Sequence, residues 1–512
     1  MYIYRDFQEL VKYIIIMAFF MTAELSLTDT NLDEAYNYNI ERPYYPVFIN
    51  VCDISDRTSK VHCYCDSPKR KMASKADCWV FNGGIAEDDP IWPSFSTQSQ
   101  LEELIFNVRS DGGLTFIPAK AIVRLDNLKY LYIQYGTITS IPSYAFTNSS
   151  TIKQIVLKSN KIANLERHSF AQMMMLSNLS LEENHISQLK RDVFFALPNL
   201  HILHISNNNL SLIHEGCFKH LNNLIELKLD YNFISVVTRE MLEGLENLSR
   251  LDLRNNKLTM IGNLAFSELW NLKELLLDNN AIEFISERAF GGLSQLRKLS
   301  LSGNKLTTFF EDILEDMQNI LVLDLSYNQL ETMSYDTVRP VIKNDKAGSA
   351  TVYLDGNPFT CDCRLSWIYA LRNETKDNNL RMILERITCV SDVNLDRIIN
   401  KVNELEAGKA TEGAAYEDES YKDYDKNYGI TNNLMYDDPS QQEVKSKKLT
   451  EIPLEVLACP KELMQSMEET YGHPVQNEIR LKAYSTANSV DAHLIFFFIN
   501  VDIDLFINFH ST

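Results

Sequence analysis

Apolar residues recur along the middle of the chain at fixed intervals. Seven segments fit the pattern L-x-x-L-x-L-x-x-N-x-L, in which leucine-like residues alternate with variable ones and an asparagine closes each run. Equivalent asparagines stand 24 residues apart, and Asn160 and Gly136 occupy the same place in the two preceding units. The seven asparagines are Asn184, Asn208, Asn232, Asn256, Asn280, Asn304 and Asn328.

This alternation predicts one short β-strand in each unit, with its leucines on a single face. The rest of the unit would return along the opposite side, where a recurring phenylalanine fills the core. Because one unit cannot bury its apolar face alone, nine consecutive units predict a stacked solenoid. Each asparagine amide is expected to satisfy backbone groups in the turn after its strand. The phenylalanines are Phe146, Phe170, Phe194, Phe218, Phe266 and Phe290.

Nine cysteines fall into an early group of four, a late group of four and Cys217 between them. The open ends of a solenoid need caps, and disulfides at both ends would supply them. A tetrahedral zinc site is the alternative for each group. Cys217 stands beside Phe218, in a slot that holds alanine or valine in other repeats, which predicts a buried and unreactive thiol. The grouped cysteines are Cys52, Cys63, Cys65, Cys78, Cys361, Cys363, Cys389 and Cys459.

The ends of the chain suggest secretion. The apolar run 13–21 follows Arg5 and Lys12 and is shorter than the about 20 residues that cross a bilayer, which favours a secretory signal over a buried helix. The tail carries Asp502 and Asp504, which argue against a membrane-spanning helix. Small residues at 485–489 are compatible with a lipid-anchor signal, although an altered C-terminal sequence is an alternative.

The sequence thus predicts five regions. They are a signal peptide (1–25), an N-terminal region with a cysteine cap (26–105), the repeat array (106–348), a C-terminal cysteine cap (349–462) and a tail (463–512). An acidic, tyrosine-rich stretch at 404–440 interrupts the last cap and is expected to be a disordered loop. Four of its tyrosines are candidates for sulfation: Tyr416, Tyr421, Tyr424 and Tyr428.

The stretch N-P-F-T-C-D-C-R-L-S-W at 357–367 resembles the C-terminal cap of the cysteine-flanked leucine-rich-repeat family of extracellular proteins. The resemblance implies an α/β solenoid, a curved horseshoe of 24-residue repeats with disulfide-stapled caps. It also implies that Cys361 pairs with Cys389 and Cys363 with a fourth cysteine. That cysteine normally follows within one cap's length, whereas the only candidate here, Cys459, comes seventy positions after Cys389.

Three features together resemble one branch of this family, the arthropod cell-surface adhesion proteins. They are the early cysteine cluster at 63–78, the first repeat L-K-Y-L-Y-I-Q-Y-G-T and the acidic insertion. The resemblance implies homophilic adhesion between neurons and muscles. It also implies a glycosyl-phosphatidylinositol anchor on the outer face of the plasma membrane. The alternatives are a receptor or co-receptor for a different protein, and a secreted protein.

Composition and motifs limit the classes of molecule that the protein is expected to bind. The formal net charge of −20 argues against nucleic acid, which binds to basic surfaces. The sequence contains no Gly-rich phosphate loop, metal-spaced histidines or nucleophile motif, so we expect neither an enzyme nor a cofactor or metal site. The expected partner is a protein, another copy of this chain by resemblance.

The variable positions between inward leucines would form the concave face. Charges there alternate in sign up one column, so they could pair within the molecule or form a self-complementary binding face. Candidate binding residues are Glu226, Arg250, Asp252, Arg254, Glu274, Lys298 and Tyr231. Glycosylation sequons stand at Asn148, Asn178, Asn209, Asn247 and Asn373.

Overall fold

The computed structural model describes residues 48–54, 58–146, 150–344, 349–391, 399, 446–457 and 459–460. These residues belong to one compact unit that begins at Phe48. The predicted signal peptide, the acidic insertion, the tail from 463 onward and the Asn148 sequon lie outside the described residues. None of the described helices combines the length and apolar character needed to cross a membrane.

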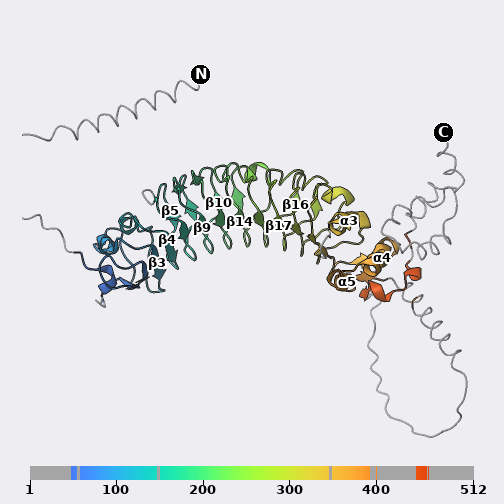
Figure 1. Cartoon of the computed structure of the whole chain (residues 1–512), viewed down its shortest axis with the longest axis horizontal. Helices are drawn as coiled ribbons and strands as arrows, with labels where there is room; N and C mark the ends of the chain where they lie inside the picture. The colour runs from blue at the N-terminus through green and yellow to red at the C-terminus, as the bar shows by residue number, and fades with distance from the viewer. Residues whose placement is uncertain are drawn as a thin grey trace, which may run out of the picture. The chain divides into compact units, whose positions relative to one another are not determined.

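A 13-stranded sheet runs through the whole unit and lines the inner side of the arc formed by the repeats (Figure 1). The first two strands pair antiparallel, and every later pair is parallel. In order across the sheet the strands are β1 (Val61–Cys65), β2 (Lys75–Val80), β3 (Glu103–Val108), β4 (Tyr130–Gln134), β6 (Gln154–Val156), β9 (Asn178–Ser180), β12 (Ile202–His204), β14 (Glu226–Lys228), β15 (Arg250–Asp252), β17 (Glu274–Leu276), β19 (Lys298–Ser300), β20 (Val322–Asp324) and β21 (Thr351–Tyr353).

The other side of the arc carries short strand pairs and short helices (Figure 1). Four two-stranded parallel sheets join neighbouring repeats there. They pair β5 (Ser140–Ile141) with β7 (Asn164–Leu165), β8 (Phe170–Ala171) with β11 (Phe194–Phe195), β10 (Gln188–Leu189) with β13 (Leu212–Ile213), and β16 (Met260–Ile261) with β18 (Phe284–Ile285). The helices of the array and its last repeat are α2 (Ala119–Ile122), η3 (Glu240–Leu242), η4 (Glu311–Leu314) and α3 (Tyr335–Lys343).

The core is a continuous stack of leucines and phenylalanines between these two sides. Rings of Phe146, Phe170, Phe194 and Phe218 stack in sequence, with centroids 5.5, 6.0 and 6.3 Å apart. Leu242 takes the next place and interrupts the stack before Phe266. Cys217 is fully buried beside this stack, and burial raises the pKa of its thiol, as expected for an unreactive cysteine.

The asparagines form a ladder that joins successive repeats. The Asn232 Nδ2 donates to the carbonyl oxygens of Leu229 and Ile205 at 3.1 and 2.9 Å, and its Oδ1 accepts from the Leu210 N–H at 3.0 Å. Asn184, Asn208, Asn256, Asn280, Asn304 and Asn328 repeat this set of bonds. The structural role predicted for these asparagines is confirmed.

Disulfides close both ends of the array. At the start, Cys52 bonds to Cys65, and Cys63 to Cys78 across the β1–β2 hairpin. At the end, Cys361 bonds to Cys389 and Cys363 to Cys459. All eight cysteines of the two groups are therefore in disulfides, and none is available to a zinc ion.

The C-terminal cap is assembled from two stretches of chain on either side of the insertion. The first contains β22 (Phe359–Thr360), α4 (Ser366–Glu374), α5 (Asn378–Leu384) and β23 (Thr388–Val390). The second contains β24 (Ser446–Lys448), which pairs antiparallel with β23, and the turns η6 (Leu449–Glu451) and η7 (Leu454–Val456). The Tyr369 hydroxyl of α4 lies within hydrogen-bond distance of the carbonyl oxygens of Leu449 and Ile452 and has one proton to share between them. The fourth cysteine thus belongs to a segment that packs as part of the cap.

Candidate functional site

The inner face of the sheet brings four of the seven predicted binding residues together on four adjacent strands. Glu226, Arg250, Glu274 and Lys298 lie directly beside one another in register on β14, β15, β17 and β19. Lys228 follows on β14, two residues beyond Glu226. We call Glu226, Lys228, Arg250, Arg254, Glu274 and Lys298 the charged face.

The ion pairs on this face do not simply follow the column. Arg250 pairs with Glu274 across neighbouring strands. Glu226 instead meets Lys228 of its own strand, with a nitrogen–oxygen distance of 3.1 Å, while Lys298 makes no ion pair with any described residue. The sequence left open whether the charges of this column pair with one another within the molecule. Among its four residues, only Arg250 and Glu274 do so. Lys228 reaches Glu226 because both side chains emerge on the same face of one strand.

His204 of β12 is half-buried between two carboxylates. Its Nδ1 lies 3.6 Å from Glu182 and its Nε2 lies 3.3 Å from Glu226. Burial, and then the nearby Lys228 ammonium, lower the pKa of His204, and the two carboxylates oppose this effect only in part. A neutral ring has one N–H, so it cannot donate to both carboxylates at once.

Asp252 was predicted to contact a partner, but only 1% of its side chain is exposed. Its carboxylate accepts from the Arg254 guanidinium at 2.6 and 2.9 Å and from the Arg254 backbone N–H at 3.2 Å. The Arg254 side chain remains 41% exposed. Asp252 therefore positions Arg254 and does not itself reach the surface.

A second row of carboxylates is held by hydroxyl groups. The Ser300 hydroxyl donates to Asp278, and the Ser302 backbone N–H donates to the same carboxylate at 3.1 Å. Burial raises the pKa of Asp278, although these two donors act in the opposite direction. Ser206 donates to Asp230 in the same way. Neither serine was singled out from the sequence: Ser206 lies two residues after β12, whereas Ser300 is the last residue of β19.

Tyr231 lies outside the strands, in the turn that follows β14. It has a positive φ of 53°, and 55% of the residue is exposed. With the exposed Phe233 it lines a hollow of about 590 Å³ formed by the turns that follow β9, β12, β14 and β15, and Asn209 lines the same hollow. A sugar on the Asn209 sequon would therefore stand beside Tyr231.

The predicted glycosylation sites fall on different sides of the array. Asn178 lies in β9 on the inner face, between Gln154 and Ile202 of the neighbouring strands. Asn209 and Asn247 are exposed in the turns, and Asn373 is exposed on α4. Of the four sequons among the described residues, only Asn178 would thus carry a sugar directly on the sheet.

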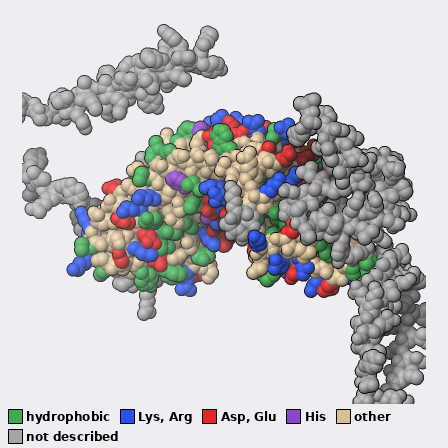
Figure 2. Space-filling view, turned by 45° about the vertical axis from the view of Figure 1, so that its right-hand side comes forward, with side chains coloured by type: hydrophobic (Ala, Val, Ile, Leu, Met, Phe, Trp, Pro, Cys, Tyr) green, Lys and Arg blue, Asp and Glu red, His purple; other side chains and the backbone are tan. Residues whose placement is uncertain are grey.

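Acidic and basic side chains are intermixed over the visible surface rather than separated by sign (Figure 2). Within the described ranges, no group of three or more His, Cys, Asp or Glu side chains is arranged to hold a metal ion. The charged face is therefore broad, polar and built on rigid strands, which suits contact with another large molecule.

Comparison with known protein families identifies the repeats as leucine-rich repeats. The leucine-rich-repeat family pattern matches residues 126–186, 174–234, 198–258, 246–306 and 295–340. Connectin of Drosophila melanogaster is 38% identical over 80 residues, which is 15% of this chain and 12% of Connectin. The match thus spans about an eighth of that protein.

Three solved structures are similar to this chain at low identity. An internalin of Listeria monocytogenes is 18% identical, with 62% of this chain and 79% of that one covered and a TM-score of 0.43. A leucine-rich-repeat protein of Leptospira interrogans is 23% identical, with coverage of 53% and 71% and a TM-score of 0.41. The structure of the Drosophila Toll–Spatzle complex gives 20% identity, coverage of 58% and 53%, and a TM-score of 0.38.

Proposed function

The chain is a leucine-rich-repeat protein, and from this premise we propose that it binds another protein through its charged face. The observation that carries the proposal is the set of charged side chains on four adjacent strands. Arg250, Arg254 and Glu274 keep 35 to 41% of their side chains exposed while ion pairs hold them in place. Such pre-positioned groups lose little conformational freedom when a partner binds.

We further propose that the partner is a second copy of the chain on an apposed cell. The mixed signs of the charged face support this, because a two-fold contact between identical copies needs both signs on one surface. The resemblance to arthropod adhesion proteins supports it too, as do the disulfides, which persist in oxidising compartments outside the cytosol. Attachment to the plasma membrane by a lipid anchor is part of the same proposal.

A single substitution tests whether the charged face is used. Lys298→Asn creates the sequon Asn-Leu-Ser at 298–300, at the place on β19 that Asn178 holds on β9. A sugar there would project from the charged face, and we expect it to abolish aggregation of cells that display the protein. Lys298→Gln, which removes the charge without adding a sugar, is the matched control. Unchanged aggregation by the glycosylated variant would overturn the proposal.

Mixing two labelled cell populations separates the two kinds of partner. If only expressing cells enter the aggregates, the contact is homophilic. If expressing cells recruit non-expressing cells, the partner is a different protein, which supports the second candidate function of a receptor or co-receptor. Release of the protein by a phosphatidylinositol-specific lipase would test the lipid anchor independently.

A further inference from the structure

The outer side of the array carries apolar side chains that the described part of the chain leaves exposed. Leu212, Val236, Met260 and Phe284 occupy equivalent positions in four consecutive repeats, 24 residues apart. Their exposed fractions are 49, 58, 50 and 48%. Single exposed apolar residues are common, but a row of four in register is a feature of interaction surfaces. We call these four residues the flank stripe.

A slot opens within the stripe, at the repeat where the outer strand pairs are interrupted. The β10–β13 pair ends at Ile213 and the β16–β18 pair begins at Met260. No backbone hydrogen bond between described residues joins the intervening segment 236–238 to either pair. Both outer edges therefore have unpaired backbone groups beside apolar side chains.

The sequence of this repeat explains the interruption. Its residues V-V-T-R-E-M-L-E-G-L place Met241 and Leu242 where the preceding repeat has Cys217 and Phe218. The turn η3 forms here, and the Thr238 hydroxyl accepts from the Met241 backbone N–H at 3.3 Å. The segment is thereby drawn into a turn instead of a strand.

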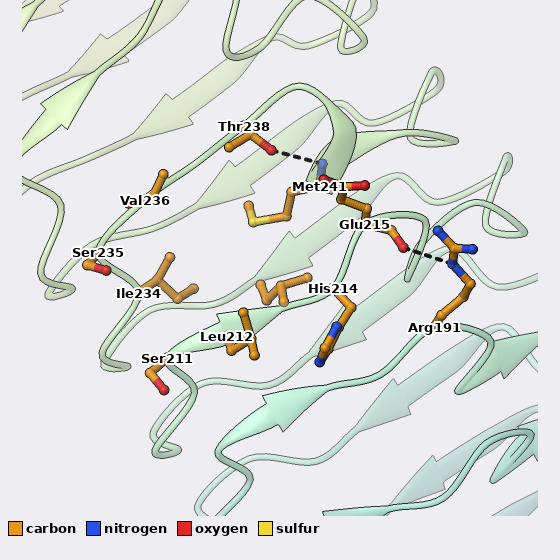
Figure 3. Close-up of a pocket in the computed structure, with 11 residues that line it drawn as sticks. Arg191, Ser211, Leu212, His214, Glu215, Ile234, Ser235, Val236, Thr238 and Met241 are labelled. Atoms are coloured by element: carbon orange, nitrogen blue, oxygen red, sulfur yellow. Dashed lines mark hydrogen bonds between the residues drawn. The ribbon is translucent and has the colours of Figure 1, made fainter.

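The resulting slot has a volume of about 540 Å³ and an apolar centre (Figure 3). Leu212, Ile213, Ile234, Val236 and Met241 line this centre. Polar side chains surround it, and at one end the Arg191 Nε donates to the Glu215 carbonyl oxygen at 3.3 Å (Figure 3).

The opposite end of the stripe has a projecting aromatic ring with acidic neighbours. Phe284 packs edge-on against Phe310, with ring centroids 6.4 Å apart, and remains half exposed. Glu283 and Glu287 stand on either side of it in the sequence, and both are exposed. Glu283 is also 3.2 Å from Lys305.

We propose that two copies of this chain associate side by side through the flank stripe, with Phe284 of each copy seated in the slot of the other. A two-fold axis that passes between Val236 and Met260 reverses the order of the repeats. It sets Leu212 opposite Phe284 and Val236 opposite Met260 of the second copy. Two equivalent contacts then form, as an isologous interface requires.

Charge complementarity favours a second copy as the occupant. The slot carries Arg191 and the exposed His214 at its rim, whereas Glu283 and Glu287 accompany the ring that would enter it. Glu215 is the one acidic residue of the slot, and its carbonyl oxygen holds Arg191 in place. The contact lies on the outer side of the repeats, so it leaves the charged face free for the partner proposed above.

The stripe offers a direct test by glycosylation. Val236→Asn creates the sequon Asn-Val-Thr at 236–238, in the centre of the stripe. Sedimentation of the full chain secreted from animal cells should show a dimer for the wild type and a monomer for this variant. Val236→Gln, which is polar but carries no sugar, should retain the dimer. A monomeric wild type, or a glycosylated variant that dimerises as the wild type does, would overturn the proposal.

Two further sets of variants test whether Phe284 of one copy enters the slot of the other. Phe284→Ala should raise the dimer dissociation constant by about tenfold or more, as for an interface anchor. Arg191→Glu and Glu287→Arg should each weaken the dimer, and the double variant should restore most of the lost affinity. If the double variant is no tighter than the singles, the proposed orientation is wrong.

Dimer formation through the flank stripe can be tested separately from binding through the charged face. The Lys298→Asn variant, which blocks the charged face, should sediment as the wild-type dimer even where cell aggregation is lost. If that variant becomes monomeric, the copies meet through the charged face, and the flank-stripe proposal fails. Far-ultraviolet circular dichroism of every variant shows that a change in sedimentation is not caused by unfolding.

Discussion

At the scale of single residues, the repeated asparagine uses both ends of its side chain. The Asn232 Nδ2 donates to the carbonyl oxygens of Ile205 and Leu229, and its Oδ1 accepts from the Leu210 N–H, so one side chain joins two consecutive repeats. All of these groups are buried. Removing the amide would leave them without partners in an apolar environment, which makes the position sensitive to substitution.

We therefore expect Asn232→Ala to lower the free energy of unfolding by about 2 kcal/mol or more, since each unpaired buried group costs about 1–3 kcal/mol. Urea unfolding followed by circular dichroism measures the change. Asn263→Ala is the matched control, because Asn263 is exposed and no hydrogen bond of its side chain to another described residue is recorded. Equal losses in the two variants would contradict the role of the ladder.

His204 gives a prediction for pH. Its folded-state pKa is lowered by burial and Lys228, so protonation favours the unfolded state. Its contribution to stability is complete above the unfolded pKa of about 6.5 and falls as the pH drops through that value. The urea midpoint of the wild type should therefore decrease more between pH 7.5 and pH 5 than that of His204→Gln. Parallel curves for the two proteins would show that His204 does not titrate differently on folding.

At the scale of elements, the C-terminal cap depends on a segment that is remote in the sequence. The Cys363–Cys459 disulfide has a sequence separation of 96 residues and holds the stretch from β24 to η7 against α4 and β23. Leu449, Ile452 and Leu457 of this stretch are buried. The segment covers apolar surface that the end of the array would otherwise expose.

Replacing Cys363 and Cys459 together by serine should lower the free energy of unfolding by about 2–5 kcal/mol, the usual loss when a native disulfide is removed from a small domain. The double substitution avoids a leftover reactive thiol. Cys217→Ala is the control, because alanine occupies the equivalent slot in the repeats of Ala265 and Ala289, and it should cost much less. Thermal unfolding of the wild type, the double variant and Cys217→Ala measures these changes. If the double variant is as stable as the wild type, packing alone holds the cap.

At the scale of the whole molecule, the Asn178 sugar would divide the inner face into two parts. β4 and β6 lie on one side of β9, and the charged face lies on the other. A sugar projecting from β9 would cover the neighbours Gln154 and Ile202 and leave the strands beyond β12 accessible. The partner is therefore expected to use the later repeats.

We expect Asn178→Gln to alter cell aggregation by opening the first part of the inner face, and Arg250→Glu to reduce aggregation. The second effect follows because the substitution places two carboxylates together at the Arg250–Glu274 pair. A cell-aggregation assay with equal surface expression measures both. If neither variant changes aggregation, the inner face is not the contact surface.

The sequence alone determined the repeat architecture, the inward leucines, the asparagine ladder and the register that aligns Glu226, Arg250 and Glu274. Each of these follows from a period of 24 residues, because stacking identical units brings equivalent positions side by side. The resemblance of the last cap also anticipated that Cys363 and Cys459 pair.

Only the tertiary structure decided which charges meet and which apolar residues stay uncovered. Asp252 is buried beneath Arg254, and Glu226 lies beside Lys228 and His204, because the reach and direction of side chains on neighbouring strands select the partners. The slot within the flank stripe likewise arises where one irregular repeat forms the turn η3 in place of an outer strand. A periodic pattern describes what the repeats share, whereas both of these features depend on how individual repeats differ and what lies next to them.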